Sequence, residues 1–469
     1  MNSDEECMST IEIPLLVPSS SMTTVSSTNT GSTATTSTEH KLYPQRWIIM
    51  VLFMLYTING GMQWIQFSII NDIVVKYYSV SPTTVEWTSN IFPLSYILCI
   101  VPSLHVLERI GIRNMMLIAT TGTFTGAWIK VFSVAPNRFY LVLLGQAFQA
   151  IFENCTFAIA ARFTAVWFGA KEISIAGALA LFGDQVGGAI GFKLPSLMIH
   201  DNSNTAVIED GLRRMHCSIA ALSTLVLLLI ITFFKEKPPL PSSVAQTLQN
   251  KVKTEPVLKK LKYILEQPSF ILILLSYGLC IGAFNAFAVL LNQTVLNHFP
   301  GHDEAVGNIG FVLMLAGMAG SLILGYSLDK THLFKENAAF VTICTTISVI
   351  LFTCSLTIHD IRFVYGSAML IGFFIQGFYS TGVQMAIEVT YPITEDVSSA
   401  IMMAFVHMVT LILTSGYGYA VKQYGDMKSN IGLICIFSLS ATFALFIPPN
   451  LKRQKFEHSV EVEEIQEFL

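Results

Sequence analysis

Charged residues are scarce in this 469-residue sequence, where Asp, Glu, Lys and Arg together make up only 12%. A water-soluble protein of this length has about a quarter of its residues charged, so the scarcity excludes an ordinary soluble fold. The net charge of −4 offers no strongly basic surface for nucleic acid. Apolar side chains take the place of charge, with 52% of the residues and a mean hydropathy of +0.58. We therefore expect lipid to surround most of this chain.

Cysteine pairs and catalytic motifs are also missing. The eight cysteines include no Cys-x-x-Cys pair and fall mostly within apolar stretches, which predicts small buried side chains rather than disulfides or a metal site. There is no nucleotide-binding loop and no nucleophile elbow. We therefore expect a protein that is not an enzyme and that holds no metal and no cofactor. The polar N-terminal segment contains no apolar signal region, so the first apolar run is expected to direct its own insertion.

Apolar runs long enough to cross a membrane recur along the chain. A spanning helix needs about 20 mostly apolar residues, and we expect an all-α membrane protein with twelve such helices. The first six are predicted over 47–71, 87–107, 114–134, 139–161, 173–198 and 215–234. The second six are predicted over 268–296, 307–328, 338–357, 362–387, 397–421 and 430–448.

Polar segments divide the chain into five parts. These are a disordered Ser/Thr-rich tail (1–45), a six-helix half (46–234), a basic linker (235–267), a second six-helix half (268–449) and a C-terminal tail (450–469). Six helices, a linker and six more helices is the layout of the major facilitator fold. The linker carries seven lysines, and the positive-inside rule places such a segment in the cytoplasm. Both termini are then cytoplasmic.

Charged turns recur at matching places in the two halves. LERIGIR follows the second predicted span, and GYSLDK ends the eighth. Each turn places an acid before a base, Glu108 with Arg109 and Asp329 with Lys330. Charged turns are common in short cytoplasmic loops of any membrane protein, but their matched order favours an internal repeat. We expect these four charges to act in a conformational change of the two halves.

Amide side chains follow one face of the first predicted span. Asn59, Gln63 and Gln66 are spaced by four and three residues, which brings them to the same side of a helix. Trp64 lies in the middle of this span, too deep for the aromatic belt at the membrane surface. Because polar side chains in hydrocarbon are costly and usually face the interior of a helix bundle, this face is expected to line a solute cavity. Ordinary packing is the alternative for Trp64.

The fourth span repeats the pattern with a carboxylate. Gln146, Gln149 and Glu153 are spaced by three and four residues and share one helix face. A lone carboxylate within a membrane must be paired, protonated or solvated. Three roles are open for Glu153: binding a cation, carrying a proton, or a structural pair with Arg162 or Lys130.

Further polar residues fall within the remaining spans. They include Asp184 in the fifth span, Asn285 and Gln293 in the seventh, and His407 in the eleventh. Each alone is more often a contact between helices than a ligand contact, but together they surround the place where a major facilitator has its cavity. The expected cavity is rich in amides and acids, with Lys193 as its main base. Such a cavity favours a cationic or zwitterionic solute.

Several stretches resemble one family of major facilitators. They are NGGMQWIQFSIIN, GAWIKVFSV, LGQ, VWFGAKEIS, AVLLNQTVL, GFVLMLAGMAGSLILGYSLD and EVTYP, and they extend over nearly the whole membrane region. The chain resembles the heme and choline transporters named after the feline leukaemia virus subgroup C receptor. The resemblance implies facilitated transport of choline and ethanolamine, with heme also claimed for the family.

The resemblance also implies where the solute binds. In the family's choline site a tryptophan of the first helix and a tyrosine of the seventh enclose the ammonium, and glutamines of the fourth and eleventh helices assist. Trp64 matches the tryptophan, and Gln146 matches the fourth-helix glutamine. Asn285 stands at the tyrosine position and His407 at the eleventh-helix glutamine position. Glu153 stands in the fourth helix where a glutamine is expected.

These departures change the expected substrate. Loss of one aromatic wall should weaken quaternary ammonium binding by roughly fivefold or more, and helical spacing turns Phe284 and Phe287 away from Asn285. We therefore expect a carrier of choline, ethanolamine or another small organic cation, shifted away from choline. The predicted substrate-binding residues are Asn59, Gln63, Trp64, Gln146, Glu153, Asn285, Gln293 and His407.

Other functions stay open at this point. A heme or porphyrin carrier would need an axial ligand, for which His407 is the candidate. A proton-coupled carrier of another amine would use Glu153 and Asp184. A non-transporting receptor would have lost the cavity amides, which this sequence keeps. The expected partners are a small-molecule substrate and the lipid bilayer, with no nucleic acid, and we expect a monomer in the plasma membrane.

Overall fold

The computed structural model describes residues 43–169, 172–201, 204–238, 257–331, 333–358, 360–390 and 395–448. Within these ranges every regular element is a helix. Both predicted tails lie almost entirely outside the described residues, as does much of the predicted linker. What the sequence predicts for those segments stays a prediction.

The first group of helices precedes the linker. Its elements are α2 (Gln45–Ile65), η1 (Ser68–Ile70), α3 (Asn71–Tyr78), α4 (Pro82–Val131), α5 (Phe139–Glu153), α6 (Cys155–Trp167), α7 (Ile173–Met198) and α8 (Thr205–Phe233).

The second group follows the linker, and its first helix lies inside the segment predicted as linker. Its elements are α10 (Val257–Leu265), α11 (Pro268–Val289), α12 (Leu291–Leu296), α13 (Asp303–Thr331), α14 (Phe334–Thr357), α15 (Ile361–Thr390), α16 (Glu395–Tyr424) and α17 (Asp426–Leu445).

Ten helical segments of the described chain are long and apolar enough to cross a membrane. One of them, α4, is two helices joined at a kink, because Gly111 within it has φ 82° and ψ 176°. The shorter helices α5 and α6 meet at Asn154 and continue one another as far as Trp167. The prediction of an all-α membrane protein is confirmed. Twelve crossings result when α4 is divided at Gly111 and α5 with α6 is counted as one.

The first and seventh crossings are interrupted at matching places. Helix α2 gives way to η1 and α3, and α11 gives way to α12. The residues at these breaks, Ile70 (φ −117°, ψ 30°) and Leu290 (φ −99°, ψ 8°), leave helical geometry. Equivalent breaks in the two groups favour the internal repeat that the charged turns suggested.

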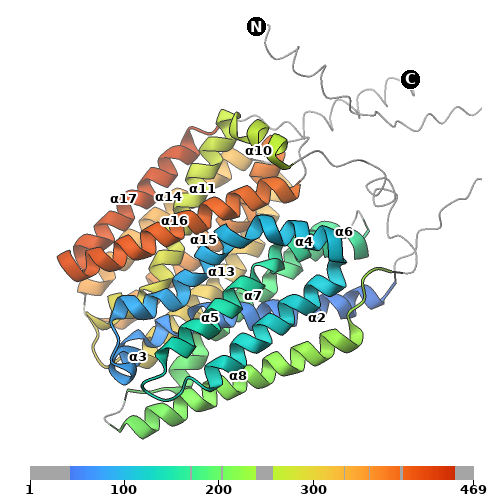
Figure 1. Cartoon of the computed structure of the whole chain (residues 1–469). Coiled ribbons are helices and arrows are strands. Elements are labelled where there is room, and N and C mark those ends of the chain that lie inside the picture. Colours follow the sequence, from blue (N-terminus) through green and yellow to red (C-terminus); the bar gives the residue numbers. More distant parts are fainter. Residues whose placement is uncertain are drawn as a thin grey trace, which may run out of the picture. The chain divides into compact units, whose positions relative to one another are not determined.

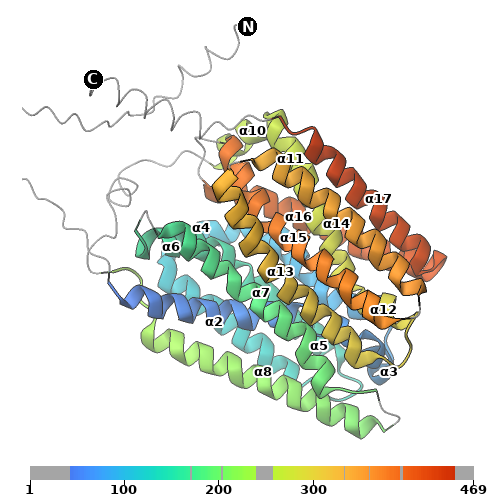
Figure 2. The same ribbon diagram turned by 180° about the vertical axis from the view of Figure 1, so that it is seen from behind.

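The two groups pack side by side. Helices α2 to α8 form one bundle and α11 to α17 the other, as Figures 1 and 2 show from opposite sides. Between the bundles α7 packs on α13, and α4 packs on α16. Inside the first bundle α7 lies very close to α2, since a Cβ at Gly187 would stand 2.4 Å from the carbonyl oxygen of Ile58. These contacts bring α2, α4, α7, α13 and α16 around the middle of the molecule.

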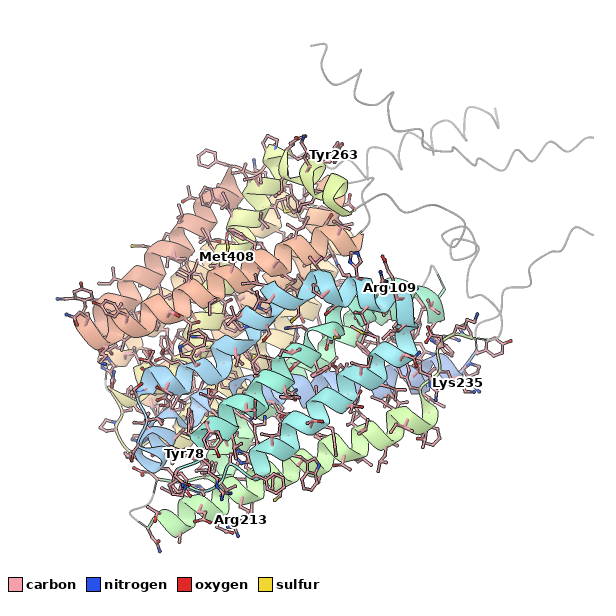
Figure 3. The ribbon with its side chains drawn as sticks, viewed as in Figure 1. Tyr78, Arg109, Arg213, Lys235, Tyr263 and Met408 are labelled. Carbon is pink, nitrogen blue, oxygen red and sulfur yellow. The ribbon has the colours of Figure 1, made fainter. Side chains whose placement is uncertain are left out.

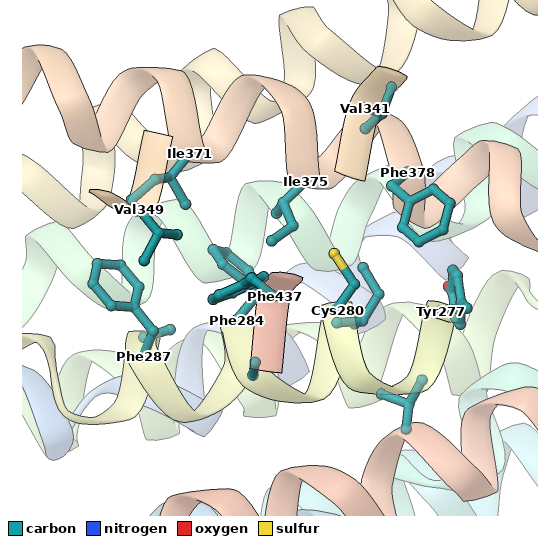
Figure 4. Close-up of a cluster of buried hydrophobic side chains, with 14 of the residues drawn as sticks. Tyr277, Cys280, Phe284, Phe287, Val341, Val349, Ile371, Ile375, Phe378 and Phe437 are labelled. Atoms are coloured by element: carbon teal, nitrogen blue, oxygen red, sulfur yellow. The ribbon is translucent and has the colours of Figure 1, made fainter. Parts of the chain in front are cut away.

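The interior of the second bundle is apolar. Tyr277, Cys280, Phe284 and Phe287 follow one face of α11 and point toward α14, α15 and α17 (Figure 4). The rings of Phe287 and Phe352 meet edge to face with centroids 4.9 Å apart. The prediction that Phe284 and Phe287 turn away from the direction of Asn285 is confirmed.

The crossings define two ends of the molecule. Arg109 and Lys235 lie at one end, and Tyr78 and Arg213 lie at the other (Figure 3). We call these the Lys235 end and the Tyr78 end.

Candidate functional site

A buried lysine holds two of the predicted glutamines. Lys130 Nζ donates to Gln63 Oε1 at 2.6 Å and to Gln146 Oε1 at 2.7 Å. Gln146 Nε2 in turn donates to the backbone oxygen of Gln63 at 3.0 Å. The lysine is 1% exposed and both glutamines are fully buried, so these amides accept the hydrogen bonds of a buried amine and offer no free surface. The sequence alone indicated Lys130 only as a partner for Glu153.

Asn59 belongs to the same buried network. Gln63 Nε2 donates to the backbone oxygen of Asn59 at 3.0 Å, and Ser223 Oγ donates to Asn59 Oδ1 at 2.9 Å. The network therefore joins α2, α4, α5 and α8. Asn59, Gln63 and Gln146 fix the shape of the first bundle, and a direct contact of these three with a solute stays a prediction.

The other predicted site residues keep some exposure. Trp64, Glu153, Asn285, Gln293 and His407 are all half-buried. The side chain of Trp64 packs against the apolar cluster that fills the second bundle and extends to α4 and α7 of the first. Trp64 therefore lies where the two bundles meet.

Two carboxylates reach the α2 backbone just before Trp64. A Cβ at Gly60 would stand 2.3 Å from Glu153 Oε1, and a Cβ at Gly61 would stand 2.6 Å from Asp184 Oδ1. Only glycines leave room for both acids. Gly60 and Gly61 precede Trp64 by four and three residues, so all three lie on the same side of α2. The acids and the indole therefore occupy neighbouring turns of one helix face.

We call Gly60, Gly61 and Trp64, with the two acids that reach them, the patch on α2. Its two carboxyl groups have one basic group, Lys130, beside them. Glu153 and Asp184 repel each other, while Lys130 attracts Glu153. Arg162, the other base considered for Glu153, donates instead to the backbone oxygen of Leu107 at 3.1 Å. One ammonium against two carboxylates leaves one negative charge when all three groups are ionised. An uncompensated charge inside a membrane protein calls for a cation or a proton.

The second bundle contributes polar groups without an aromatic wall at Asn285. Asn285 Nδ2 donates to Thr410 Oγ1 at 3.1 Å. The ring of His407 lies against that of Tyr96, with centroids 4.3 Å apart and planes at 39°, and its buried Nδ1 has no hydrogen-bond partner among the described residues. Tyr96 belongs to α4, so this ring contact joins the two bundles.

Hydrogen bonds between the bundles gather toward the Tyr78 end. Gln293 Nε2 donates to Glu86 Oε1 at 3.0 Å. Asn292 Nδ2 donates to the backbone oxygen of Ile69 at 2.7 Å and to Asp72 Oδ1 at 3.1 Å. The interruption that creates α12 brings both amides to the opposite bundle. We call this row of contacts between the two bundles the seam. Gln293, predicted as a substrate contact, lies in it.

Lys193 also belongs to the seam. Its Nζ lies 3.4 Å from Glu304 Oε1 and donates to Asn308 of α13. The expectation that Lys193 is the main base of the cavity is wrong, because acceptors of the other bundle hold it near the Tyr78 end. Within one turn of Lys193, a Cβ at Gly307 would stand 2.5 Å from the Cβ of Ser196, so α7 and α13 touch here.

The two charged turns predicted from the sequence lie at the Lys235 end. Glu108, Arg109 and Lys330 are exposed, and the side chain of Asp329 lies outside the described residues. The carboxylate that organises the first turn is Glu236, which accepts hydrogen bonds from the backbone N–H groups of Ile112 at 2.8 Å and Arg113 at 2.6 Å. Sequence reasoning missed Glu236, because its partners lie more than a hundred residues earlier in the chain.

Two helical bundles joined along a seam, with charged and aromatic side chains buried between them, define a membrane transporter of the major facilitator class. The family model described as Major Facilitator Superfamily matches residues 52–406. A solved structure of a bacterial homologue of the human lysosomal transporter Spinster, inward-facing and unoccupied, aligns with a TM-score of 0.69 and 13% identity, and the alignment covers 88% of this chain and 99% of that one. The predicted major facilitator fold is confirmed.

Two relatives narrow the family. The choline/ethanolamine transporter flvcr2a of Danio rerio is 34% identical over 417 residues, which cover 88% of this chain and 89% of the relative. The choline/ethanolamine transporter FLVCR2 of Homo sapiens is 33% identical over 430 residues, or 91% and 82% of the two chains. The chain belongs to the FLVCR family of major facilitator transporters, as the sequence resemblance predicted.

Proposed function

We propose that this protein carries a small organic cation, choline or ethanolamine, across a membrane. The observation that carries the proposal is the patch on α2 where Glu153 and Asp184 reach the backbone one turn before Trp64, two carboxyl groups beside the single amine of Lys130. An aromatic face with carboxylates beside it is the chemistry that binds an ammonium group. The names of the relatives, choline/ethanolamine transporters, support the same substrate class.

In the proposed mechanism the bundles rock about the site. The seam at the Tyr78 end closes one side, so the solute would enter and leave from the Lys235 end in this conformation. We place the Lys235 end and both termini in the cytoplasm, since the basic linker starts there. The structure would then be the inward-facing state of a monomer in the plasma membrane.

Each group has a proposed role in that cycle. Trp64 would lie against the ammonium, while Glu153 and Asp184 would balance its charge. Asn285 and His407 would contact the solute from the second bundle, so that binding couples the two bundles. The amides around Lys130 would keep the patch in shape, and Gln293 would open and close with the seam.

Uptake of labelled choline and ethanolamine into cells that express the protein tests the proposal. We expect saturable uptake that falls at least tenfold in Trp64→Ala. Trp128→Ala is the matched control, because Trp128 is 40% exposed and bonds only to Thr224 of α8 among the described residues. If the wild-type protein is at the cell surface and takes up neither solute, the proposal is wrong.

Heme is the second candidate, and this patch does not favour it. The propionates of a porphyrin are anionic, so carboxylates such as Glu153 and Asp184 would repel them. Labelled heme in the same cells separates the two functions.

A further inference from the structure

Hydrogen-bond acceptors outnumber donors around the patch on α2. Glu153 Oε2 accepts one hydrogen bond, from Gln149 Nε2 at 3.2 Å. Asp184 makes no side-chain hydrogen bond or ion pair with the residues that the structure describes. Gln149 Oε1 is buried and has no hydrogen-bond partner in the described part of the chain. The patch therefore presents carboxylate and amide oxygens that need N–H or O–H groups when a solute displaces water from them.

Ammonium solutes differ in what they can give these oxygens. A primary ammonium such as that of ethanolamine carries three N–H donors, whereas the trimethylammonium of choline carries none. Both carry the same charge and both can rest on an indole. The difference matters most at buried acceptors, because an oxygen left without a donor costs free energy that a solvated one does not.

Few aromatic faces are placed to enclose a quaternary group. Trp64 supplies one face, and Tyr379 lies near Asp184 with its hydroxyl donating to Met403. Asn285 bonds to Thr410, and Phe284 and Phe287 point into the core of the second bundle. A trimethylammonium group gains most when several aromatic faces enclose it. The balance of contacts on this patch therefore favours N–H donors over methyl groups.

We propose that Glu153 and Asp184 make this carrier selective for ammonium groups that bear N–H donors, so that it takes ethanolamine in preference to choline. Asp184 acts in this assignment as a specificity determinant beside Trp64, in addition to balancing the charge of the solute. This inference rests on the proposed transport of small organic cations and adds the order of preference among them.

A methylation series tests the order of preference. Ethanolamine, N-methylethanolamine, N,N-dimethylethanolamine and choline differ only in how many N–H groups are replaced by methyl groups. Each compound competes against labelled ethanolamine in cells expressing the wild-type protein. We expect apparent affinity to fall along the series, with roughly a tenfold or larger difference between its ends. Equal affinities, or tighter binding of choline, would overturn the inference while leaving organic-cation transport intact.

Isosteric variants assign the preference to the two acids. Glu153→Gln and Asp184→Asn keep the size of the side chains and should compress the difference between ethanolamine and choline to within about threefold. Glu209→Gln is the control, because Glu209 pairs with Arg213 at the Tyr78 end, and it should keep the wild-type order. An unchanged order in both site variants would overturn the assignment to these acids. If no compound enters wild-type cells, the transport proposal itself fails. If a variant does not reach the surface, the wild-type series still decides the preference.

Discussion

The carboxylate of Glu153 lies against the backbone of Gly60, with Oε1 only 2.3 Å from where a Cβ at position 60 would stand. This carboxylate is the centre of the proposed site. It contacts the backbone of α2 at a glycine, one turn before Trp64. Its position depends on a glycine as much as on the acid.

Gly60→Ala should therefore disable the site without an acidic residue being touched. The added methyl group must push the Glu153 carboxylate or the α5 helix away from α2, and we expect ethanolamine uptake to fall at least tenfold at normal surface expression. Gly366→Ala is the matched control, since no other described part of the chain lies within 4 Å of a Cβ at that position of α15. Wild-type uptake by Gly60→Ala would show that the contact with Glu153 does not matter for transport.

Lys130 should stabilise the first bundle more than any exposed lysine does. Lys130→Met leaves Gln63 Oε1 and Gln146 Oε1 buried without their donor, and we expect a loss of about 2–4 kcal/mol in the free energy of unfolding. Thermal unfolding of the purified protein in detergent measures it. Lys76→Met is the comparison, because Lys76 lies in an ion pair whose lysine side chain is 58% exposed, and its loss should cost under about 1 kcal/mol. Equal effects of the two changes would contradict the network.

The seam between α7 and α13 should open during transport. The Cβ of Ser196 and a Cβ at Gly307 would lie 2.5 Å apart, and a shift of about 1 Å brings the pair to disulfide geometry. Ser196→Cys combined with Gly307→Cys should cross-link under mild oxidation and stop uptake, and a reducing agent should restore it. Each single cysteine variant is the control. Full uptake by the cross-linked protein would contradict a seam that opens.

The kink in α4 should depend on Gly111. At φ 82° and ψ 176° the backbone is in a region that essentially only glycine occupies, and a Cβ there would stand 2.4 Å from Glu236 Oε1. We expect Gly111→Ala to cost about 1–3 kcal/mol in stability. Gly177→Ala should cost nothing, since a Cβ at that position would meet no other helix or loop of the described residues within 4 Å. The same melting temperature for both variants would rule out strain at Gly111.

Much of the fold follows from local pattern. Apolar runs, their length and the basic linker predict the crossings, because each crossing must satisfy its own backbone in lipid. The pattern does not predict that α2 and α11 break before they end. The pattern also assigns Gln63 and Trp64 of α2 to the same site, whereas the structure gives them different surroundings. Gln63 is buried and accepts a hydrogen bond from Lys130, and Trp64 lies where the bundles meet.

The candidate site shows the limit of helix spacing more clearly. Spacing places Glu153 and Trp64 on polar faces of their own helices, and that much the sequence predicts. Whether Asp184 joins them depends on how closely α7 packs on α2, which a glycine contact decides. The prediction that Lys193 faces the cavity is wrong because it also depends on packing between helices. Its partners Glu304 and Asn308 belong to the other bundle. The spacing of polar and apolar residues within one helix does not show which distant helix it will contact.

The most direct test of the central claim, that this site recognises a positive charge, compares choline with its neutral carbon isostere, 3,3-dimethyl-1-butanol. The two have nearly the same shape and differ in charge, so shape alone cannot separate them. We predict that the neutral alcohol inhibits labelled ethanolamine uptake at least tenfold more weakly than choline, since it gains neither the indole face of Trp64 nor the carboxylates of Glu153 and Asp184. Equal inhibition by the two compounds would contradict a cation site.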